Sequence, residues 1–127
     1  MADVNRGNRP LSPHLSIYRM PLNGIMSITH RITGVGMSIT AMLIVWWFLA
    51  AATSEEYFAT ANWVMTSWIG DIIMFVSLLA IWYHFCSGVR HLVWDTGSGL
   101  GQRRVKRSGI AALITAAVLS LITIILA

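Results

Sequence analysis

The sequence Leu79-Ala-Ile-Trp-Tyr-His84-Phe-Cys-Ser-Gly88-Val-Arg-His91-Leu-Val-Trp-Asp95 decides how this chain is interpreted. On a helix that turns about 100° per residue, its polar and small side chains fall within roughly 60° of one another. With the preceding turn they are Ser77, His84, Gly88, His91 and Asp95. Ionisable residues inside an apolar helix usually face a bundle interior, a partner or a cofactor, because their exposure to lipid is costly. This stripe therefore predicts a site.

The composition indicates the solvent in which this helix lies. Of the 127 residues 56% are hydrophobic, six are Trp and only 11% are charged, which is typical of a small integral membrane protein with a single membrane domain. The net charge of +4 comes from basic residues that flank apolar segments, so it argues against a nucleic-acid partner. The only cysteine is Cys86, which excludes an internal disulfide, a covalently attached haem and a four-cysteine iron–sulfur site. A redox centre would have to be bound non-covalently or carried by a partner.

Three apolar runs are long enough to cross a bilayer. The first, Ile32–Ser54, has no formal charge and spans roughly 34 Å as a helix. A single helix over Trp63–Asp95 would measure about 48 Å against a hydrocarbon core of about 30 Å, so only part of it can lie in the membrane. The run Ser108–Ala127 is again uncharged. We expect transmembrane helices near residues 25–53, 69–94 and 108–127, in one membrane domain (25–127) that follows an N-terminal segment (1–24).

The charged segments between the spans predict the orientation. We expect an acidic turn at Glu55 and Glu56 and a flexible basic loop over Gly97–Arg107. Positively charged segments stay on the cytoplasmic side of bacterial membranes, which places the N-terminal segment and the basic loop there. We expect Trp63, Trp68 and Trp94 to lie at the membrane interfaces.

The start of the first span carries a second polar stripe. Its members follow the spacing of one helical face and are Ser27, His30, Arg31, Gly34 and Ser38. One interpretation is that His30 and Arg31 only extend toward the lipid headgroups. The other is a packed site, in which small residues admit a neighbour or a ligand. Since the first span begins on the side where the second ends, this stripe lies level with His91 and Asp95.

His84 has the chemistry to define the site. It lies about 16 Å deeper in the membrane than Asp95. Its neutral imidazole could be a hydrogen-bonded packing residue, a proton relay or an axial metal ligand, and Gly88 favours a ligand because it leaves room for a flat macrocycle. His91 cannot complete the coordination of the same iron, because two imidazoles about 10 Å apart on one helix face cannot approach a metal from opposite sides. Cys86 points away from the stripe, and we expect it to be a small buried residue.

Three blocks of this sequence resemble a known family. They are Arg9-Pro-Leu-Ser-Pro-His14-Leu-Ser-Ile-Tyr18-Arg19, Ser27-Ile-Thr-His30-Arg31-Ile-Thr-Gly34, and the segment from His84 to Asp95. Together they resemble the signature blocks of the cytochrome b subunits of succinate dehydrogenase, respiratory complex II. The resemblance covers nearly the whole chain.

The resemblance implies an all-α integral membrane anchor with three transmembrane helices, which forms a helical bundle with a second hydrophobic anchor subunit. An iron–sulfur subunit and a flavoprotein subunit would dock on its cytoplasmic face. Electrons from succinate would pass through the flavin and the iron–sulfur centres to ubiquinone, so the enzyme activity belongs to the assembled complex. The location implied is the bacterial inner membrane, with a mitochondrial inner membrane as the less favoured alternative.

The resemblance also implies roles for single residues. His84 would be an axial ligand of a b-type haem, and a His of the second anchor subunit would be the other. Ser27 and Arg31 match residues of the quinone site. His30 and Arg31 match positions near the haem propionates, where cations at the edge of the macrocycle are favourable.

Two further residues match the family, and one alternative function competes with the resemblance. Asp95 and Arg90 match positions near the quinone pocket of the family. The competing interpretation is a non-redox membrane anchor or assembly subunit, in which the polar stripes only hold helices together. A haem-free anchor of the same architecture is a third possibility. An absorption spectrum of the purified membrane complex, oxidised against reduced, separates these interpretations.

Overall fold

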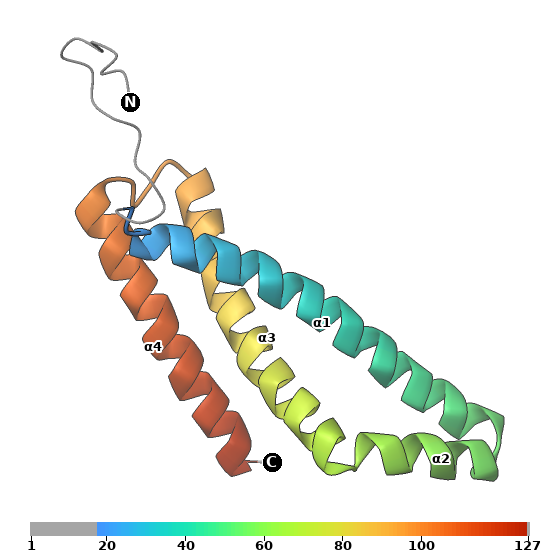
Figure 1. The fold of residues 1–127 in the computed structure, drawn as a ribbon. Helices are drawn as coiled ribbons and strands as arrows, with labels where there is room; N and C mark the ends of the chain where they lie inside the picture. Colours follow the sequence, from blue (N-terminus) through green and yellow to red (C-terminus); the bar gives the residue numbers. More distant parts are fainter. Residues whose placement is uncertain (1–17, 127) are drawn as a thin grey trace, which may run out of the picture.

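The computed structural model describes residues 18–126, in which all regular secondary structure is helical. The four helices are α1 (Leu22–Thr53), α2 (Glu55–Met65), α3 (Trp68–Asp95) and α4 (Gln102–Leu126). Of these, α1, α3 and α4 are long and apolar enough to cross a membrane, which confirms the predicted all-helical fold with three spans. The block around His14 lies outside the described residues. Figure 1 shows α1, α3 and α4 converging at one end, whereas α1 and α3 diverge toward the end where α2 connects them.

The buried core lies where the three long helices converge. It consists of Met26 on α1, Tyr83 and Cys86 on α3, and Ala112 and Ala116 on α4. The Tyr83 hydroxyl donates a hydrogen bond of 2.7 Å to the carbonyl oxygen of Met26 and so connects α3 to α1. Cys86 is buried, as predicted from its position off the stripe. The central element of the bundle is α3, which packs against both α1 and α4.

Small residues allow α4 to approach its neighbours closely. Its buried positions recur at helical spacing and are Gly109, Ala112, Ala116 and Ser120. Such stripes of small residues are the usual contact surface between membrane helices. At Gly109 a Cβ would lie 2.8 Å from the sulfur of Met26, so only glycine fits there without a shift. Further along, Trp82 Nε1 donates a 2.9 Å hydrogen bond to Thr123 Oγ1.

The helix α2 was not predicted from the sequence. Instead of forming an acidic turn, Glu55 and Glu56 occupy the first turn of α2, and the connection to α1 shrinks to Ser54. The Ser54 hydroxyl accepts a 3.2 Å hydrogen bond from the backbone N–H of Tyr57. An N-terminal serine cap and acidic side chains beside the positive end of the helix dipole both favour a helix start here.

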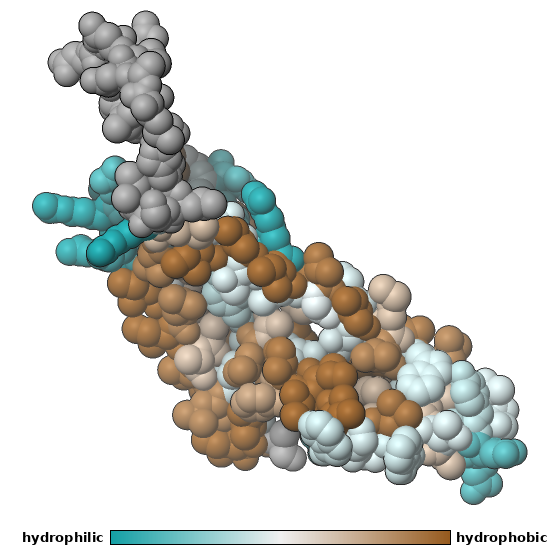
Figure 2. All heavy atoms as spheres, in the orientation of Figure 1, coloured by the Kyte–Doolittle hydropathy of each residue, from teal (hydrophilic) through white to brown (hydrophobic). Residues whose placement is uncertain are grey.

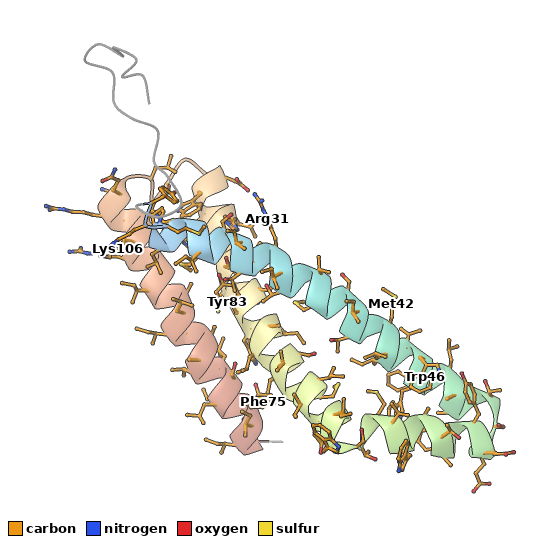
Figure 3. All side chains as sticks on the ribbon, viewed as in Figure 1. Arg31, Met42, Trp46, Phe75, Tyr83 and Lys106 are labelled. Atoms are coloured by element: carbon orange, nitrogen blue, oxygen red, sulfur yellow. The ribbon has the colours of Figure 1, made fainter. Side chains whose placement is uncertain are left out.

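Two indole hydrogen bonds hold α2 against α1. Trp46 Nε1 donates to the Tyr57 hydroxyl at 2.7 Å, and Trp47 Nε1 donates to Asn62 Oδ1 at 3.3 Å. The side chain of Trp46 lies on the α2 side of α1 in Figure 3. The paired residues lie 11 and 15 positions apart on two different helices, so the periodicity of one helix does not predict these contacts.

The corner between α2 and α3 explains why residues 63–95 do not form one helix. Ser67 caps α3 and accepts a 3.2 Å hydrogen bond from the backbone N–H of Gly70. A Cβ at Gly70 would overlap the carbonyl of Met65, so the corner requires glycine. Trp63 and Trp68 are about three-quarters exposed on either side of the corner, which is compatible with interfacial anchors.

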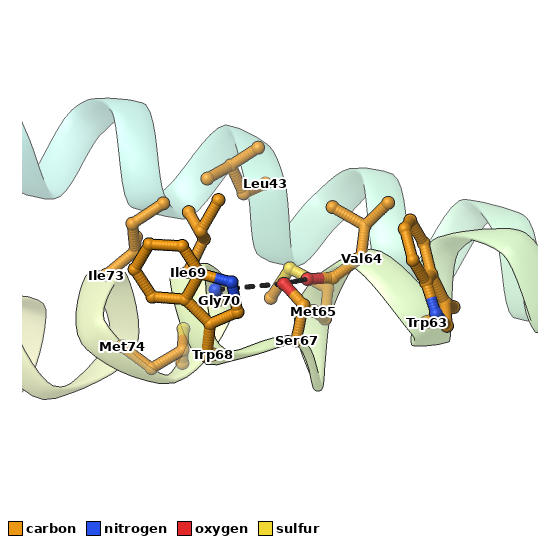
Figure 4. Close-up of a pocket in the computed structure, with 10 residues that line it drawn as sticks. All are labelled: Leu43, Trp63, Val64, Met65, Ser67, Trp68, Ile69, Gly70, Ile73 and Met74. Atoms are coloured by element: carbon orange, nitrogen blue, oxygen red, sulfur yellow. Dashed lines mark hydrogen bonds between the residues drawn. The ribbon is translucent and has the colours of Figure 1, made fainter.

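An apolar cavity of about 330 Å³ lies under this corner, lined by residues that include Leu43 of α1, Val64 of α2 and Ile73 of α3. Figure 4 shows the lining residues and the Ser67 hydrogen bonds beside it. The cavity lies at the end of the bundle opposite the histidines, so it plays no part in the site described below.

The basic run over residues 102–107 forms the first turns of α4, and the prediction of a loop there was wrong. Arg, Lys and Gln are good helix formers. The backbone N–H of Val105 bonds to the Gly101 carbonyl at 2.9 Å, and Gly101 has φ 114°, so glycine provides the turn just before the helix. In Figure 2 hydrophilic side chains gather at this end, and the body of the bundle shows mainly apolar side chains.

Candidate functional site

Three histidine rings lie together where α1 and α3 meet. The ring of His30 on α1 stacks on that of His84 on α3, with 3.8 Å between centroids and 13° between planes. The ring of His91, two turns further along α3, packs edge-on against His30 at 5.0 Å. The two polar stripes inferred from the sequence therefore meet at His30 and His84. Within residues 18–126 no group of three or more His, Cys, Asp or Glu side chains is arranged to hold a metal ion.

Hydrogen bonds to α1 fix the orientation of the His84 ring. Its Nδ1 lies 3.0 Å from the carbonyl oxygen of His30 and 3.2 Å from Thr33 Oγ1. Because a carbonyl oxygen only accepts hydrogen bonds, Nδ1 carries the proton in a neutral ring. Nε2 then has a free lone pair, and it makes no hydrogen bond within the described part of the chain. Metal-binding histidines commonly donate their other ring N–H to a backbone carbonyl in this way.

The glycine that contacts the His84 ring is Gly34 of α1, whereas the sequence drew attention to Gly88 of α3. At Gly34 a Cβ would lie only 3.0 Å from Cε1 of His84, so this glycine permits the close approach of α1 to the ring. At Gly88 a Cβ would meet nothing within 4 Å. Gly88 therefore leaves open space next to the stripe, as expected, and Gly34 makes the tight contact.

The inner nitrogen of His30 lacks a partner. Its Nδ1 is buried and makes no hydrogen bond within residues 18–126. A buried polar atom without a partner costs free energy, and such atoms frequently mark a missing ligand or neighbour. The free lone pair of His84, the open space at Gly88 and this unpaired nitrogen lie in one region. These residues fit a flat cofactor that takes an axial nitrogen ligand.

Ser27 and Arg31 lie one turn apart at the start of α1. Arg31 is exposed and projects away from the bundle (Figure 3), whereas Ser27 is half-buried. Neither side chain forms a hydrogen bond or an ion pair with any of residues 18–126.

Asp95 and Arg90 do not share one environment. Asp95 is exposed at the end of α3, and no ion pair involves it in the described part of the chain. Arg90 is 6% exposed and points to the side of α3 that faces α4. On a helical wheel Arg90 falls roughly 120° from His84, which is the signal that would have separated it from the stripe.

Arg90 connects three helices. Its Nε donates to Ser108 Oγ, and its Nη2 donates to Asn23 Oδ1 and to the Val105 carbonyl, each at 3.1 Å. Its guanidinium also lies 4.0 Å from the centre of the Trp94 ring. All three hydrogen-bond acceptors are neutral. Trp94, which we expected to act as an interfacial anchor, packs under this guanidinium and against His91.

One part of the α3 stripe only joins helices. The hydroxyl groups of Ser77 and Thr40 share a buried hydrogen bond of 2.7 Å, near the middle of the span. Both hydroxyl groups also bond to carbonyls of their own helices. Here the interpretation of the stripe as a helix contact is correct, whereas nearer the end of α3 the stripe meets the histidine cluster.

Comparisons with known proteins identify the family of this chain. A family model described as succinate dehydrogenase/fumarate reductase transmembrane subunit matches residues 5–123. The succinate dehydrogenase cytochrome b556 subunit of Paracoccus denitrificans is 50% identical over 125 residues, which cover 98% of this chain and 96% of the relative.

More distant relatives carry related names. The cytochrome b556 subunit of Rickettsia bellii is 36% identical over 106 residues, or 84% of this chain and 82% of the relative. The cytochrome b560 subunit of Marchantia polymorpha is 39% identical over 124 residues, or 93% and 90% of the two chains. The chain therefore belongs to the family of succinate dehydrogenase/fumarate reductase transmembrane subunits, and is a membrane subunit of a succinate:quinone oxidoreductase complex.

Proposed function

We propose that this chain is the cytochrome b membrane anchor of succinate:quinone oxidoreductase, holds a b-type haem together with a second anchor subunit, and forms part of the ubiquinone-reduction site. The placement of His84 carries this proposal. Its Nδ1–H is fixed by the carbonyl of His30, and its Nε2, inside an apolar span, makes no hydrogen bond with any of residues 18–126. The relatives' name, cytochrome b, fits such a ligand.

In the proposed haem site, His84 would be one ligand of the haem iron and a histidine of the second anchor subunit would be the other. The His30 carbonyl and the Thr33 hydroxyl hold the imidazole in one orientation. Gly88, one turn from His84 on α3, leaves open space beside the stripe. His30 and Arg31 lie at the same end of α1 and would pair with the propionates. When bound, the haem supplies one-electron redox chemistry.

In the proposed quinone site, Ser27 and Arg31 donate hydrogen bonds to the carbonyl oxygens of ubiquinone. As a quinone carbonyl gains electrons its oxygen becomes more negative, so a hydroxyl donor and a fixed guanidinium favour the reduced form. Asp95, exposed at the same end of the bundle, would border this pocket. The apolar tail of the quinone would leave between helices into lipid.

The charge distribution supports a cytoplasmic docking face on the inner membrane of a bacterium. The exposed basic side chains at the converging end of the bundle include Arg103, Arg104, Lys106 and Arg107 of α4. Exposed Glu55 and Glu56 begin α2 at the other end. By the positive-inside rule the N-terminus and the start of α4 face the cytoplasm. There an iron–sulfur subunit and a flavoprotein would deliver electrons from succinate.

Replacing Ser27 by Ala and Arg31 by Leu tests the quinone site in the assembled complex. Loss of one donor to a developing charge lowers rates about 10²- to 10³-fold in dry enzyme sites, and a partly wet site should show less. We expect succinate-driven quinone reduction to fall strongly, while succinate oxidation by an artificial acceptor stays largely intact. Ser38→Ala is the control, because Ser38 is exposed on the same helix and bonds only to the Gly34 carbonyl.

The outcomes of this experiment separate three roles. A parallel fall of both activities would mean that Ser27 and Arg31 hold the complex together. Unchanged activities would mean that Arg31 only extends toward the headgroups. A selective fall in quinone reduction supports the quinone site.

A reduced-minus-oxidised absorption spectrum of the purified complex tests the haem site. We expect His84→Leu to remove the spectrum of a haem with two imidazole ligands while the protein still inserts, and His91→Leu to retain it. An unchanged spectrum in His84→Leu would refute the ligand assignment, once His30 and His91 variants exclude ligand replacement. A wild-type complex without a haem spectrum would support the non-redox anchor.

A further inference from the structure

An apolar groove with a basic end lies on the side of α3 away from the histidines. It has a volume of about 290 Å³ and runs between α3 and α4. Its walls include Phe85 and Val89 of α3 and Ala111, Thr115 and Leu119 of α4. Phe85 and Val89 are 58% and 45% exposed, so the groove opens on the outer surface of the bundle. The apolar side chains of this surface match acyl chains in polarity.

The groove ends at a buried cation. Arg90 and Ser108 close it at the end where the three long helices converge. The guanidinium of Arg90 bonds only to neutral acceptors in the described part of the chain. No carboxylate among residues 18–126 forms an ion pair with it.

Further cations follow directly on the groove face of α4. Arg104 lies one turn before Ser108 and extends the wall of the groove toward the membrane surface, and Arg107, one turn before Ala111, lies at the edge of this wall. Arg103 and Lys106 fall on the other side of the helix, and Lys106 projects outward in Figure 3. All four side chains are exposed.

These charges are unfavourable for the helix that carries them. Cations at a helix N-terminus oppose the helix dipole, and α4 has no acidic residue in its first turn to offset them. A local conflict of this kind indicates a function for the charges, because an anion bound beside them would remove the conflict.

We propose that the groove between α3 and α4 binds an anionic phospholipid of the cytoplasmic leaflet, with one acyl chain between Phe85 and Leu119 and the phosphate against Arg104 and Arg107. An apolar groove that continues into a basic cluster at the membrane surface matches such a lipid in both of its parts. A soluble anion lacks the chain, and a zwitterionic lipid lacks the net charge. The groove thereby selects a lipid on the face of α3 that the proposed redox site does not use.

Spin-labelled lipids test the proposal on the assembled complex in phosphatidylcholine bilayers. The probes are phosphatidylglycerol and phosphatidylcholine with a nitroxide on the acyl chain, and the measurement is the motionally restricted fraction of each. We expect the wild type to prefer phosphatidylglycerol. The double variant Arg104→Gln/Arg107→Gln should lower this preference by about fivefold for each side chain in contact with the phosphate. The matched control Arg103→Gln/Lys106→Gln removes the same charge and should keep most of the preference.

A second pair of variants tests the groove itself. Ala111→Trp fills the groove and should lower the restricted fraction of phosphatidylglycerol, whereas Ala117→Trp, exposed on α4 outside the groove, should not. Equal losses in the two charge variants would overturn the proposal in favour of diffuse surface attraction. Unchanged lipid preference together with loss of the iron–sulfur subunit on native gels would overturn it in favour of a protein contact.

Discussion

Replacing Arg90 by Lys tests how much the helix junction depends on the geometry of one side chain. The guanidinium donates three hydrogen bonds, one to the Asn23 side chain of α1 and two to α4, where the Ser108 hydroxyl and the Val105 carbonyl accept them. It also packs on Trp94. A lysine keeps the positive charge but has a compact ammonium group on a flexible stem, so it cannot reproduce the planar fork of donors. The substitution therefore changes geometry without changing net charge.

The loss can be estimated from the contacts. If the ammonium keeps one of the three hydrogen bonds, two bonds to buried acceptors are lost at about 1 to 1.5 kcal/mol each, and the contact with Trp94 adds about 0.5 to 1 kcal/mol. The sum is about 2.5 to 4 kcal/mol. At about 1.4 kcal/mol per factor of ten, this corresponds to a roughly 60- to 700-fold increase in the population in which α4 separates from α3.

Cys86 provides the assay. It is the only cysteine of the chain, and it is buried in the core that α4 covers with Ala112 and Ala116. Cys86 also borders the groove between α3 and α4. Labelling in the assembled complex by a thiol reagent too bulky to enter this groove, read from the mass of this chain, therefore reports opening of the bundle. We expect labelling to accelerate in Arg90→Lys in proportion to the open population.

The matched control is Arg103→Lys, because Arg103 is exposed at the same end of α4. We expect its labelling rate to stay within about twofold of the wild type, as for most surface substitutions. Equal labelling rates in Arg90→Lys and Arg103→Lys would refute the role assigned to the guanidinium contacts.

Three further predictions follow from the helix contacts and the charges. Gly34→Ala should displace His84 by a few tenths of an ångström and alter the reduced-minus-oxidised spectrum and midpoint potential of the complex, whereas Gly36→Ala, with nothing within 4 Å of its Cβ, should leave both unchanged. Thr40→Val and Ser77→Ala should each lower the stability of the complex in a mixed-micelle denaturation, with a coupling energy of about 0.6 kcal/mol in a double-mutant cycle, and strictly additive effects would contradict the shared hydrogen bond. Reporter fusions within α2 should lie outside the cytoplasm and fusions just before α4 inside it, and the reverse pattern would place the basic end on the wrong side for its proposed partners.

The sequence alone determined the membrane fold. Bilayer thickness sets the length of an apolar helix, so a run such as Ile32–Ser54 predicts a span without knowledge of its neighbours. The two polar stripes were also predictable, because helical periodicity fixes which side chains share a face. Periodicity further separated Cys86 from the stripe. These properties depend on residues near one another in the chain.

The sequence did not predict that α2 begins at Glu55, and it wrongly predicted a loop where α4 begins. At both places the local sequence suits a turn or loop as well as a helix. Ser54 can cap a helix and Glu55 can support one, but the same residues also suit a turn, and only packing of α2 through Trp47 and Asn62 decides between them. The basic run of α4 likewise suits a loop or a helix. Its contacts, including the hydrogen bond from Arg90 to the Val105 carbonyl, decide for the helix.

The contacts within the candidate site were decided by the tertiary structure alone. Periodicity states that His30 and His84 each lie on a polar face, but the crossing and rotation of α1 against α3 determine that their rings stack. The same crossing places Gly34, and not Gly88, against the His84 ring. The three acceptors of Arg90 come from two other helices. Contacts between segments distant in the chain depend on how whole helix surfaces fit together, and that fit is a property of the packed bundle rather than of any local stretch of sequence.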